Sequence, residues 1–174
     1  MGCRPPRCRV PPQIPQRIVS GGQSGVDRAA LDVALALGLS CGGWCPRGRK
    51  AEDGPINARY PLKETPSPDY AQRTEWNVRD SDGTLILNRG ELAGGTAQTV
   101  EVAERLGKPY LIVDLAKPPS ASAIHAWVRS HKVRVLNIAG PREGKCAGIY
   151  SEAARFLRTI FGTVSDTFQS GKSV

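Results

Sequence analysis

Two glycine-rich segments of the chain carry residue types that bind phosphate groups in proteins. The first consists of Gly21, Gly22, Gln23, Ser24 and Gly25, with Arg28 one helical turn later. The second contains Gly94, Gly95 and Thr96. Glycine lets backbone N–H groups approach a phosphate closely, and the positive end of a helix dipole attracts the anion. We expect the two segments to form one site for a phosphate-bearing small molecule.

Each segment taken alone also has an ordinary structural explanation. Both lie between an apolar run and a helical pattern, so they could be tight turns in which Ser24, Asp27 or Thr96 caps the following helix. Neither segment matches the G-x-G-x-x-G pattern or the Walker pattern of nucleotide-binding loops. The occurrence of two such turns in one sheet favours a shared anion site.

A third segment, 42–55, concentrates basic residues beside a tryptophan. It contains Trp44, Arg47, Arg49 and Lys50. A flat ring next to cations suits a heterocycle that bears a phosphate, so we include Trp44 and Arg47 among the expected ligand-binding residues. The alternative is a solvated basic loop with Trp44 packed against the core. Cys45 could contact a ligand or a metal, or it could fill a small buried space.

Other polar side chains are candidates through their location alone. Arg73, Asn77 and Arg79 could face a ligand or another subunit, with an exposed helix face as the default, and Asn137 and Arg142 follow a late apolar run. Four carboxylates lie near the glycine segments, and we expect several of them to pair with arginines: Asp27, Glu52, Asp53 and Glu91. No Ser–His–Asp or G-x-S-x-G context occurs, so we assign no catalytic residue and no metal ligand.

The elements that would position these residues alternate along the chain. Apolar runs predict strands at 17–20, 41–44, 83–87, 110–115 and 133–139, and helical periodicity predicts helices at 26–37, 68–78, 96–106, 120–130 and 150–161. The stretch 46–68 is expected to be irregular. Uniformly apolar strands are typical of parallel sheets, which predicts a Rossmann-like, doubly wound α/β fold. Ligands of such sheets bind beyond the carboxyl ends of the strands, where segments 21–25, 88–95 and 140–144 would meet.

Length and composition indicate one domain. Of the 174 residues, 40% are hydrophobic and 23% are charged. We expect a single domain at 17–162, between a disordered basic, proline-rich extension at 1–16 and a flexible tail at 163–174. The apolar runs are too short to cross a bilayer, no signal-peptide pattern occurs, and the five cysteines fit no disulfide framework. These features predict a cytoplasmic protein with reduced thiols and no membrane association.

The net charge of +8 suits an anionic partner. Nucleic acid is not the partner we expect, because no zinc finger, basic heptad or recognisable base-stacking platform accompanies the charge. A phosphorylated small molecule, bound by glycine amides and by arginine or lysine side chains, fits the same charge with fewer assumptions.

Six long motifs together resemble one known family. They read IVSGGQSGVDRAALD, GGWCPRGRKAEDGPI, ARYPLKET, YAQRTEWNVRDSDGTLI, ELAGGT and NIAGPRE, and they extend from about Ile18 to about Phe161. The chain resembles the circularly permuted branch of the SLOG superfamily, whose members are named molybdenum carriers or molybdenum-cofactor carrier proteins. The resemblance implies a Rossmann-like sheet, a homo-oligomer (dimer or tetramer), and a site built from the two glycine segments. It also implies binding of molybdenum cofactor, a pterin with a dithiolene-held metal and a terminal phosphate, with Trp44 as an optional wall for the pterin.

The wider superfamily suggests a different function. Its phosphoribohydrolases, which release the base of a nucleoside monophosphate, carry a Gly-Gly-x-Gly-Thr-x-x-Glu signature. In this chain Thr99 stands where that signature places its glutamate, and Glu101 comes two residues later on a different helix face. This departure counts against hydrolysis by that mechanism, although Asp27 or Glu91 could supply a carboxylate. We therefore expect a carrier or storage protein, with a nucleotide-binding or nucleotide-hydrolysing enzyme as the first alternative and a nucleotide sensor as the second.

Overall fold

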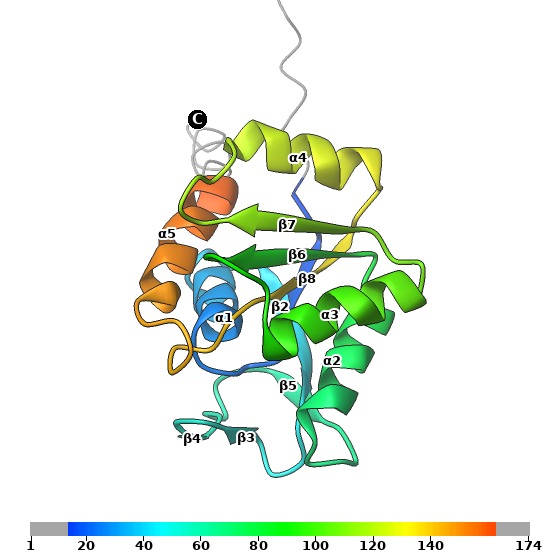
Figure 1. Ribbon diagram of the computed structural model, residues 1–174, viewed down its shortest axis with the longest axis vertical. Coiled ribbons are helices and arrows are strands. Elements are labelled where there is room, and N and C mark those ends of the chain that lie inside the picture. The colour runs from blue at the N-terminus through cyan, green and yellow to red at the C-terminus, as the bar shows by residue number, and fades with distance from the viewer. Residues whose placement is uncertain (1–13, 163–174) are drawn as a thin grey trace, which may run out of the picture.

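The apolar runs of the sequence form the strands of one parallel sheet. The computed structural model describes residues 14–162, and the six strands of its main sheet follow the order β5-β2-β1-β8-β6-β7 (Figure 1). All neighbouring strands pair in parallel. The strands are β1 (Arg17–Val19), β2 (Ser40–Cys45), β5 (Leu62–Glu64), β6 (Gly83–Asn88), β7 (Tyr110–Asp114) and β8 (Val135–Ala139). Strand β6 is buried at every position, as expected of a central parallel strand.

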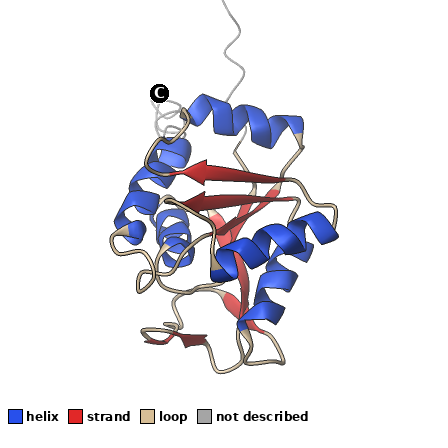
Figure 2. Cartoon of the chain, viewed as in Figure 1, coloured by secondary structure: helices blue, strands red, loops and turns tan. Residues whose placement is uncertain are grey.

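Helices cover both faces of the sheet (Figures 1 and 2). One face carries α1 (Val26–Ala36), α4 (Ala121–Ser130) and α5 (Ile149–Phe161), and the other carries α2 (Tyr70–Arg79) and α3 (Gly94–Arg105). The strand order requires this division, because right-handed crossovers in opposite directions along the sheet place their helices on opposite faces. The predicted Rossmann-like, doubly wound α/β architecture is confirmed.

The largest apolar cluster lies between the sheet and the face formed by α1, α4 and α5. Leu85 and Leu87 of β6 pack there against Val33 of α1 and Leu157 of α5, and none of these side chains is exposed to solvent. A smaller cluster with Val78 and Val102 joins α2 to α3. A third contains Leu31, Cys45, Ile56, Tyr60 and Leu62.

The expectation that 46–68 is irregular was wrong. This stretch contains a two-stranded antiparallel hairpin, β3 (Lys50–Ala51) and β4 (Gly54–Pro55), and β5, which extends the main sheet at one edge. These strands have two or three residues each, too few to produce a periodic apolar pattern. The strand β5 is held by its pairing with β2, in which Trp44 lies opposite Lys63.

The domain begins earlier than expected. Ile14 packs against the largest cluster, and the N–H of Gln16 donates to the carbonyl of Arg134 at 2.8 Å. Residues 14–16 therefore belong to the folded domain. The remainder of the predicted N-terminal extension, 1–13, and the predicted tail, 163–174, lie outside the described residues. Within 14–162, no helix is both long and apolar enough to span a bilayer.

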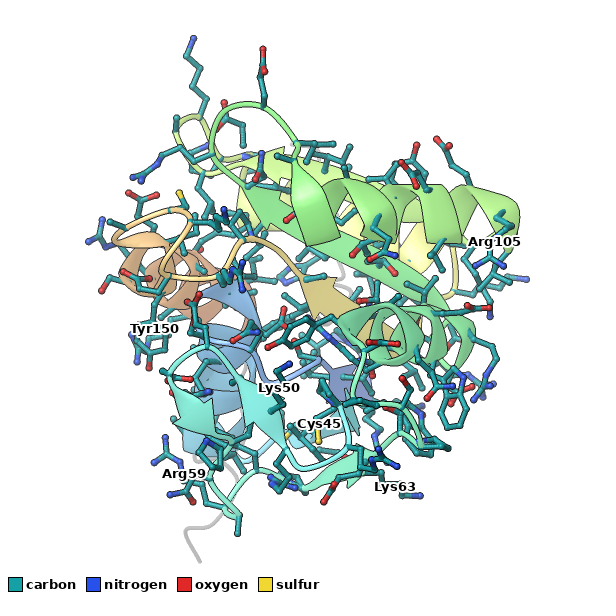
Figure 3. The ribbon with its side chains drawn as sticks, turned by 60° about the horizontal axis from the view of Figure 1, so that its bottom comes forward. Cys45, Lys50, Arg59, Lys63, Arg105 and Tyr150 are labelled. Atoms are coloured by element: carbon teal, nitrogen blue, oxygen red, sulfur yellow. The ribbon has the colours of Figure 1, made fainter. Side chains whose placement is uncertain are left out.

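One carboxylate braces three segments on the side of the sheet covered by α1 and α5. Asp32 of α1 accepts hydrogen bonds from the hydroxyls of Tyr60 at 2.8 Å and Tyr150 at 2.7 Å, and it also pairs with Arg59. Figure 3 shows Arg59 and Tyr150 on the same side of the molecule. Burial, followed by the hydrogen bond and the negative charge of Asp32, raises the pKa of Tyr150 to about 12.

The substitution Tyr150→Phe should change the pH dependence of stability. An unfolded tyrosine ionises near pH 10, whereas folded Tyr150 resists ionisation until about pH 12, so the wild-type protein loses stability as the pH rises through this window. The variant should be about 1 kcal/mol less stable at pH 8, because it lacks one hydrogen bond. The difference should shrink at pH 11. Urea unfolding at the two pH values measures it, and a constant difference would contradict the role of Asp32.

Candidate functional site

A cavity of about 520 Å³ opens at the carboxyl ends of β1, β6 and β8. All three segments expected at this edge contribute to it, together with the first turns of α2 and α3. Its lining residues include Gln23, Asp27, Tyr70, Arg73, Thr74, Asn88, Arg89, Glu91, Gly94, Gly95, Thr96, Gln98, Thr99, Gly140, Arg142, Lys145 and Cys146. The volume is in the range of small-molecule sites, and the position is the one that this class of sheet uses for ligands.

The second glycine segment forms the first turn of α3 rather than a loop before it. Helix α3 begins at Gly94, and Ala93 at its N-cap position provides no side-chain cap. The first N–H groups of a helix have no partner within the helix. A Cβ placed on Gly94 or Gly95 would meet nothing within 4 Å, so the backbone there faces open space in the cavity. Thr96, expected as the N-cap, is instead the third residue of the helix and donates its N–H to Ala93.

The first glycine segment has mainly packing roles, and only Gln23 of its five residues lines the cavity. Gly22 has a φ of +74°, and a Cβ there would collide with Leu62. Gly25, with a φ of +77°, lies against the backbone of Pro141. The Ser24 hydroxyl donates to Glu52 and caps no helix.

Arg28, another expected binding residue, is engaged in structural contacts. Its guanidinium donates to the Gly22 carbonyl at 3.1 and 3.2 Å and pairs with Asp53 at 3.2 Å. Arg28 is not among the residues that line the cavity. It therefore fixes the turn that Gly22 begins, and the prediction that it binds the ligand has no support in its position.

Gly21 makes room for a buried ion pair at the base of the cavity. Arg73 of α2 donates to Asp27 of α1 at 2.8 Å, and the Asp27 carboxylate is only 3% exposed. Burial raises the pKa of Asp27, and the charge and hydrogen bond of Arg73 oppose that shift. A Cβ on Gly21 would overlap the guanidinium of Arg73. The Nε of Arg73 is buried and has no hydrogen-bond partner within 14–162.

The cavity has an excess of positive charge. Four basic side chains line it, Arg73, Arg89, Arg142 and Lys145, against the two carboxylates Asp27 and Glu91. As expected, carboxylates near the glycine segments pair with arginines: Asp27 with Arg73, Asp53 with Arg28, and Glu52 with Arg142.

Sequence reasoning did not single out Arg89, Lys145, Cys146 or Tyr70. Arg89 is held in place by Glu152 at 2.6 Å and by the Ala147 carbonyl at 2.9 Å. The only available signal was that Arg89 directly follows a buried strand. Lys145 and Cys146 follow β8 at a distance that no local pattern marks.

The third expected segment separates into different parts of the molecule. Trp44 donates its indole N–H to Asp80 and packs edge-on against Trp76, away from the residues that line the cavity. Arg47 is exposed and also lies outside the lining, and Arg49 donates to four backbone carbonyls. Cys45 is completely buried.

Lys50, the remaining basic residue of the segment 42–55, lies close to the cavity. The Nζ of Lys50 is 5.6 Å from the ring centroid of Tyr70, which lines the cavity. The aromatic side chain at the cavity is therefore that of Tyr70, in place of the expected Trp44.

Two features considered from the sequence, the glutamate of the phosphoribohydrolase signature and a metal-binding cluster, can be compared with the structure. Thr99 lines the cavity where the phosphoribohydrolase signature has its glutamate, and its hydroxyl donates to the Gly95 carbonyl at 2.8 Å. In the part of the chain that the structure describes, no three His, Cys, Asp or Glu side chains group closely enough to hold a metal ion.

Two glycine substitutions should have opposite effects on stability. Gly21→Ala would displace Arg73 from buried Asp27, and loss of such a pair costs about 3 kcal/mol. Gly95→Ala fills open space in a helix and should be neutral or stabilising by up to about 1 kcal/mol. Thermal and urea unfolding of both variants tests the assignment. Equal stability of Gly21→Ala and the wild type would show that the pair does not depend on this gap.

Comparison with known proteins agrees with the geometry. A model of the circularly permutated YpsA SLOG family matches residues 18–161. A crystal structure of a protein from Syntrophus aciditrophicus SB, named a "putative molybdenum carrier protein", is 48% identical to this chain and superimposes with a TM-score of 0.82, covering 84% of this chain and 94% of that one. A comparison with curated proteins found no significant match. The chain belongs to the circularly permutated YpsA SLOG family.

Proposed function

We propose that the protein binds a small phosphate-bearing ligand in the cavity and that this ligand is molybdenum cofactor, held for storage or transfer. The observation that carries the proposal is the uncapped first turn of α3, where Gly94 and Gly95 leave their backbone facing open space in a positively charged cavity. Backbone N–H groups at a helix N-terminus are a common phosphate-binding arrangement.

The residues present fit the chemistry of this cofactor. The amides of Gly94 and Gly95, with Lys145, would hold its terminal phosphate. Tyr70 offers an aromatic ring for the pterin, and the buried Nε of Arg73 offers a donor for one of its acceptor atoms. A buried N–H without a partner costs about 1–3 kcal/mol, so a ligand acceptor at that point would add to affinity.

The name of the Syntrophus aciditrophicus protein supports molybdenum cofactor over other phosphorylated molecules. Nucleotides have the same phosphate chemistry, and a nucleotide-binding or nucleotide-hydrolysing protein remains the alternative. A nucleotide hydrolase of this kind would need Asp27 or Glu91 as its catalytic carboxylate, since both line the cavity. The absence of a glutamate at position 99 favours binding without turnover.

Binding should be detected as a rise in melting temperature with molybdenum cofactor, handled without oxygen, and not with AMP, GMP or NADP. A hundredfold excess over the dissociation constant stabilises a protein by about 2.7 kcal/mol. The variant Gly95→Asp should fold, because its side chain enters open space, and its charge should weaken phosphate binding at least about tenfold, or ~1.4 kcal/mol.

The matched control is Arg105→Ala. Arg105 is the last residue of the same helix, at the end opposite to Gly94 (Figure 3), so the variant changes charge without touching the cavity. If nucleotides raise the melting temperature and the cofactor does not, the ligand is a nucleotide. Release of a free base would then identify a hydrolase. Equal binding by Gly95→Asp and the wild type would remove α3 from the site.

Self-association into a dimer or tetramer, which the family resemblance implies, is proposed together with this function. Sedimentation of the purified chain measures the number of copies. The proposed role in storage or transfer operates on the single-chain cavity and does not depend on that number.

A further inference from the structure

The hairpin of β3 and β4 is attached to two of the cavity loops through one residue of its turn, Glu52. Its Oε1 accepts hydrogen bonds from the Ser24 hydroxyl and from the Gly144 N–H, the latter at 2.9 Å. Its Oε2 lies 3.3 Å from Nε of Arg142, and its own N–H donates to Oε1 of Gln23 at 2.9 Å. The side chain and amide of Glu52 therefore bridge segments 21–25 and 140–144, which also bond directly through the Glu143 N–H and the Ser24 hydroxyl at 3.1 Å.

Two of these partners are cavity residues. Gln23 and Arg142 both line the cavity, whereas Glu52 does not. The side-chain Oε1 of Gln23 accepts from the N–H groups of both Ser24 and Glu52, which fixes the orientation of the side-chain amide. The pairing with Glu52 likewise restricts the Arg142 side chain, which is 37% exposed and would otherwise be free to extend into solvent.

The electrostatic surroundings keep Glu52 ionised. Burial alone would raise its pKa, but the hydrogen bonds from Ser24 and Gly144 and the charge of Arg142 outweigh burial and hold the pKa below its usual value. Asp53, its neighbour in the turn, is a like charge and pairs separately with Arg28. The other side of the hairpin also reaches the cavity, since Lys50 lies over the ring of Tyr70, which is one of the lining residues.

We propose that Glu52 is a positioning residue of the ligand site, which orients Arg142 and Gln23 and joins the two loops that carry them. This inference rests on the proposed function for its effect on affinity. Glu52 does not contact the ligand. Glu52 holds the long, partly exposed side chain of Arg142 in one arrangement before the ligand binds. Binding therefore does not have to order that side chain.

Three variants distinguish the positioning of Arg142 and Gln23 by Glu52 from a general effect of changing the charge of the hairpin turn. Glu52→Ala removes every side-chain contact, and Glu52→Gln keeps an acceptor for Ser24 and Gly144 but loses the charge that pairs with Arg142. Asp53→Asn is the matched control, because it removes the same charge from the same turn, at a side chain that hydrogen-bonds to Arg28 and not to Arg142 or Gln23. Affinity for molybdenum cofactor should fall at least about tenfold in Glu52→Ala, less in Glu52→Gln, and less than about twofold in Asp53→Asn.

A double-mutant cycle tests whether Glu52 acts through Arg142. If it does, the loss of affinity in Glu52→Gln combined with Arg142→Ala should equal the loss in Arg142→Ala alone, because each change removes the same pairing. Additive losses would overturn the proposed route. If Glu52→Ala does not fold, Glu52→Gln and this cycle carry the test.

Hydrogen exchange without ligand distinguishes failure of this inference from failure of the proposed function. The amide of Gly144 should exchange at least about tenfold faster in Glu52→Ala than in the wild type or in Asp53→Asn. If the wild-type protein binds no cofactor, the proposed function falls, and faster exchange still supports the attachment of the loop through Glu52. Unchanged exchange, or unchanged affinity in Glu52→Ala, would overturn the inference.

Discussion

The buried ion pair between Asp27 and Arg73 is the interaction on which the site depends. Asp27 lies in the first turn of α1 on one face of the sheet, and Arg73 comes from α2 on the other. The Asp27 side chain is only 3% exposed, and the positive charge of Arg73, which α2 brings to the end of β1, offsets part of the cost of burying its carboxylate. The requirement extends to Gly21, where a side chain would occupy the place of the guanidinium. One electrostatic constraint thus fixes a helix, a glycine and the base of the cavity.

Glycine performs two separate tasks at this edge of the sheet. In the segment 21–25 the glycines allow close packing, since an added Cβ would meet Arg73, Leu62 or the backbone of Pro141. In α3 the glycines are surrounded by open space and expose their backbone to the cavity. The first group is needed to build the site and the second is available for a ligand. Similar composition therefore does not imply a similar role.

The arrangement of charges at the cavity is compatible with the proposed binding of an anion. The arginines at the cavity are restrained by carboxylates placed behind them, as Arg142 is by Glu52 and Arg89 by Glu152. Such pairs preorganise cationic groups for binding. The Rossmann-like fold itself is compatible with many activities, so the case for a carrier rests on these residues and on the family to which the chain belongs.

The sequence by itself determined the class of fold, most helix and strand positions, and the edge of the sheet at which the cavity lies. These properties follow from local patterns: buried runs such as β6 and helical periodicity are visible within a dozen residues. The family could also be identified at this level, since its motifs are contiguous. The expectation that carboxylates near the glycine segments pair with arginines was correct in general terms as well.

Only the tertiary structure decided which candidates share the cavity. Gly94 and Gly95 face it, but Trp44 lies against Trp76 outside it, and Tyr70 provides the aromatic ring. The hairpin of β3 and β4 was missed because two-residue strands have no periodicity. Pairings such as Arg73 with Asp27 or Arg142 with Glu52 join residues far apart in the chain, and composition does not specify a partner. Their selection depends on burial and on the packing of helices across the sheet, which are properties of the folded molecule.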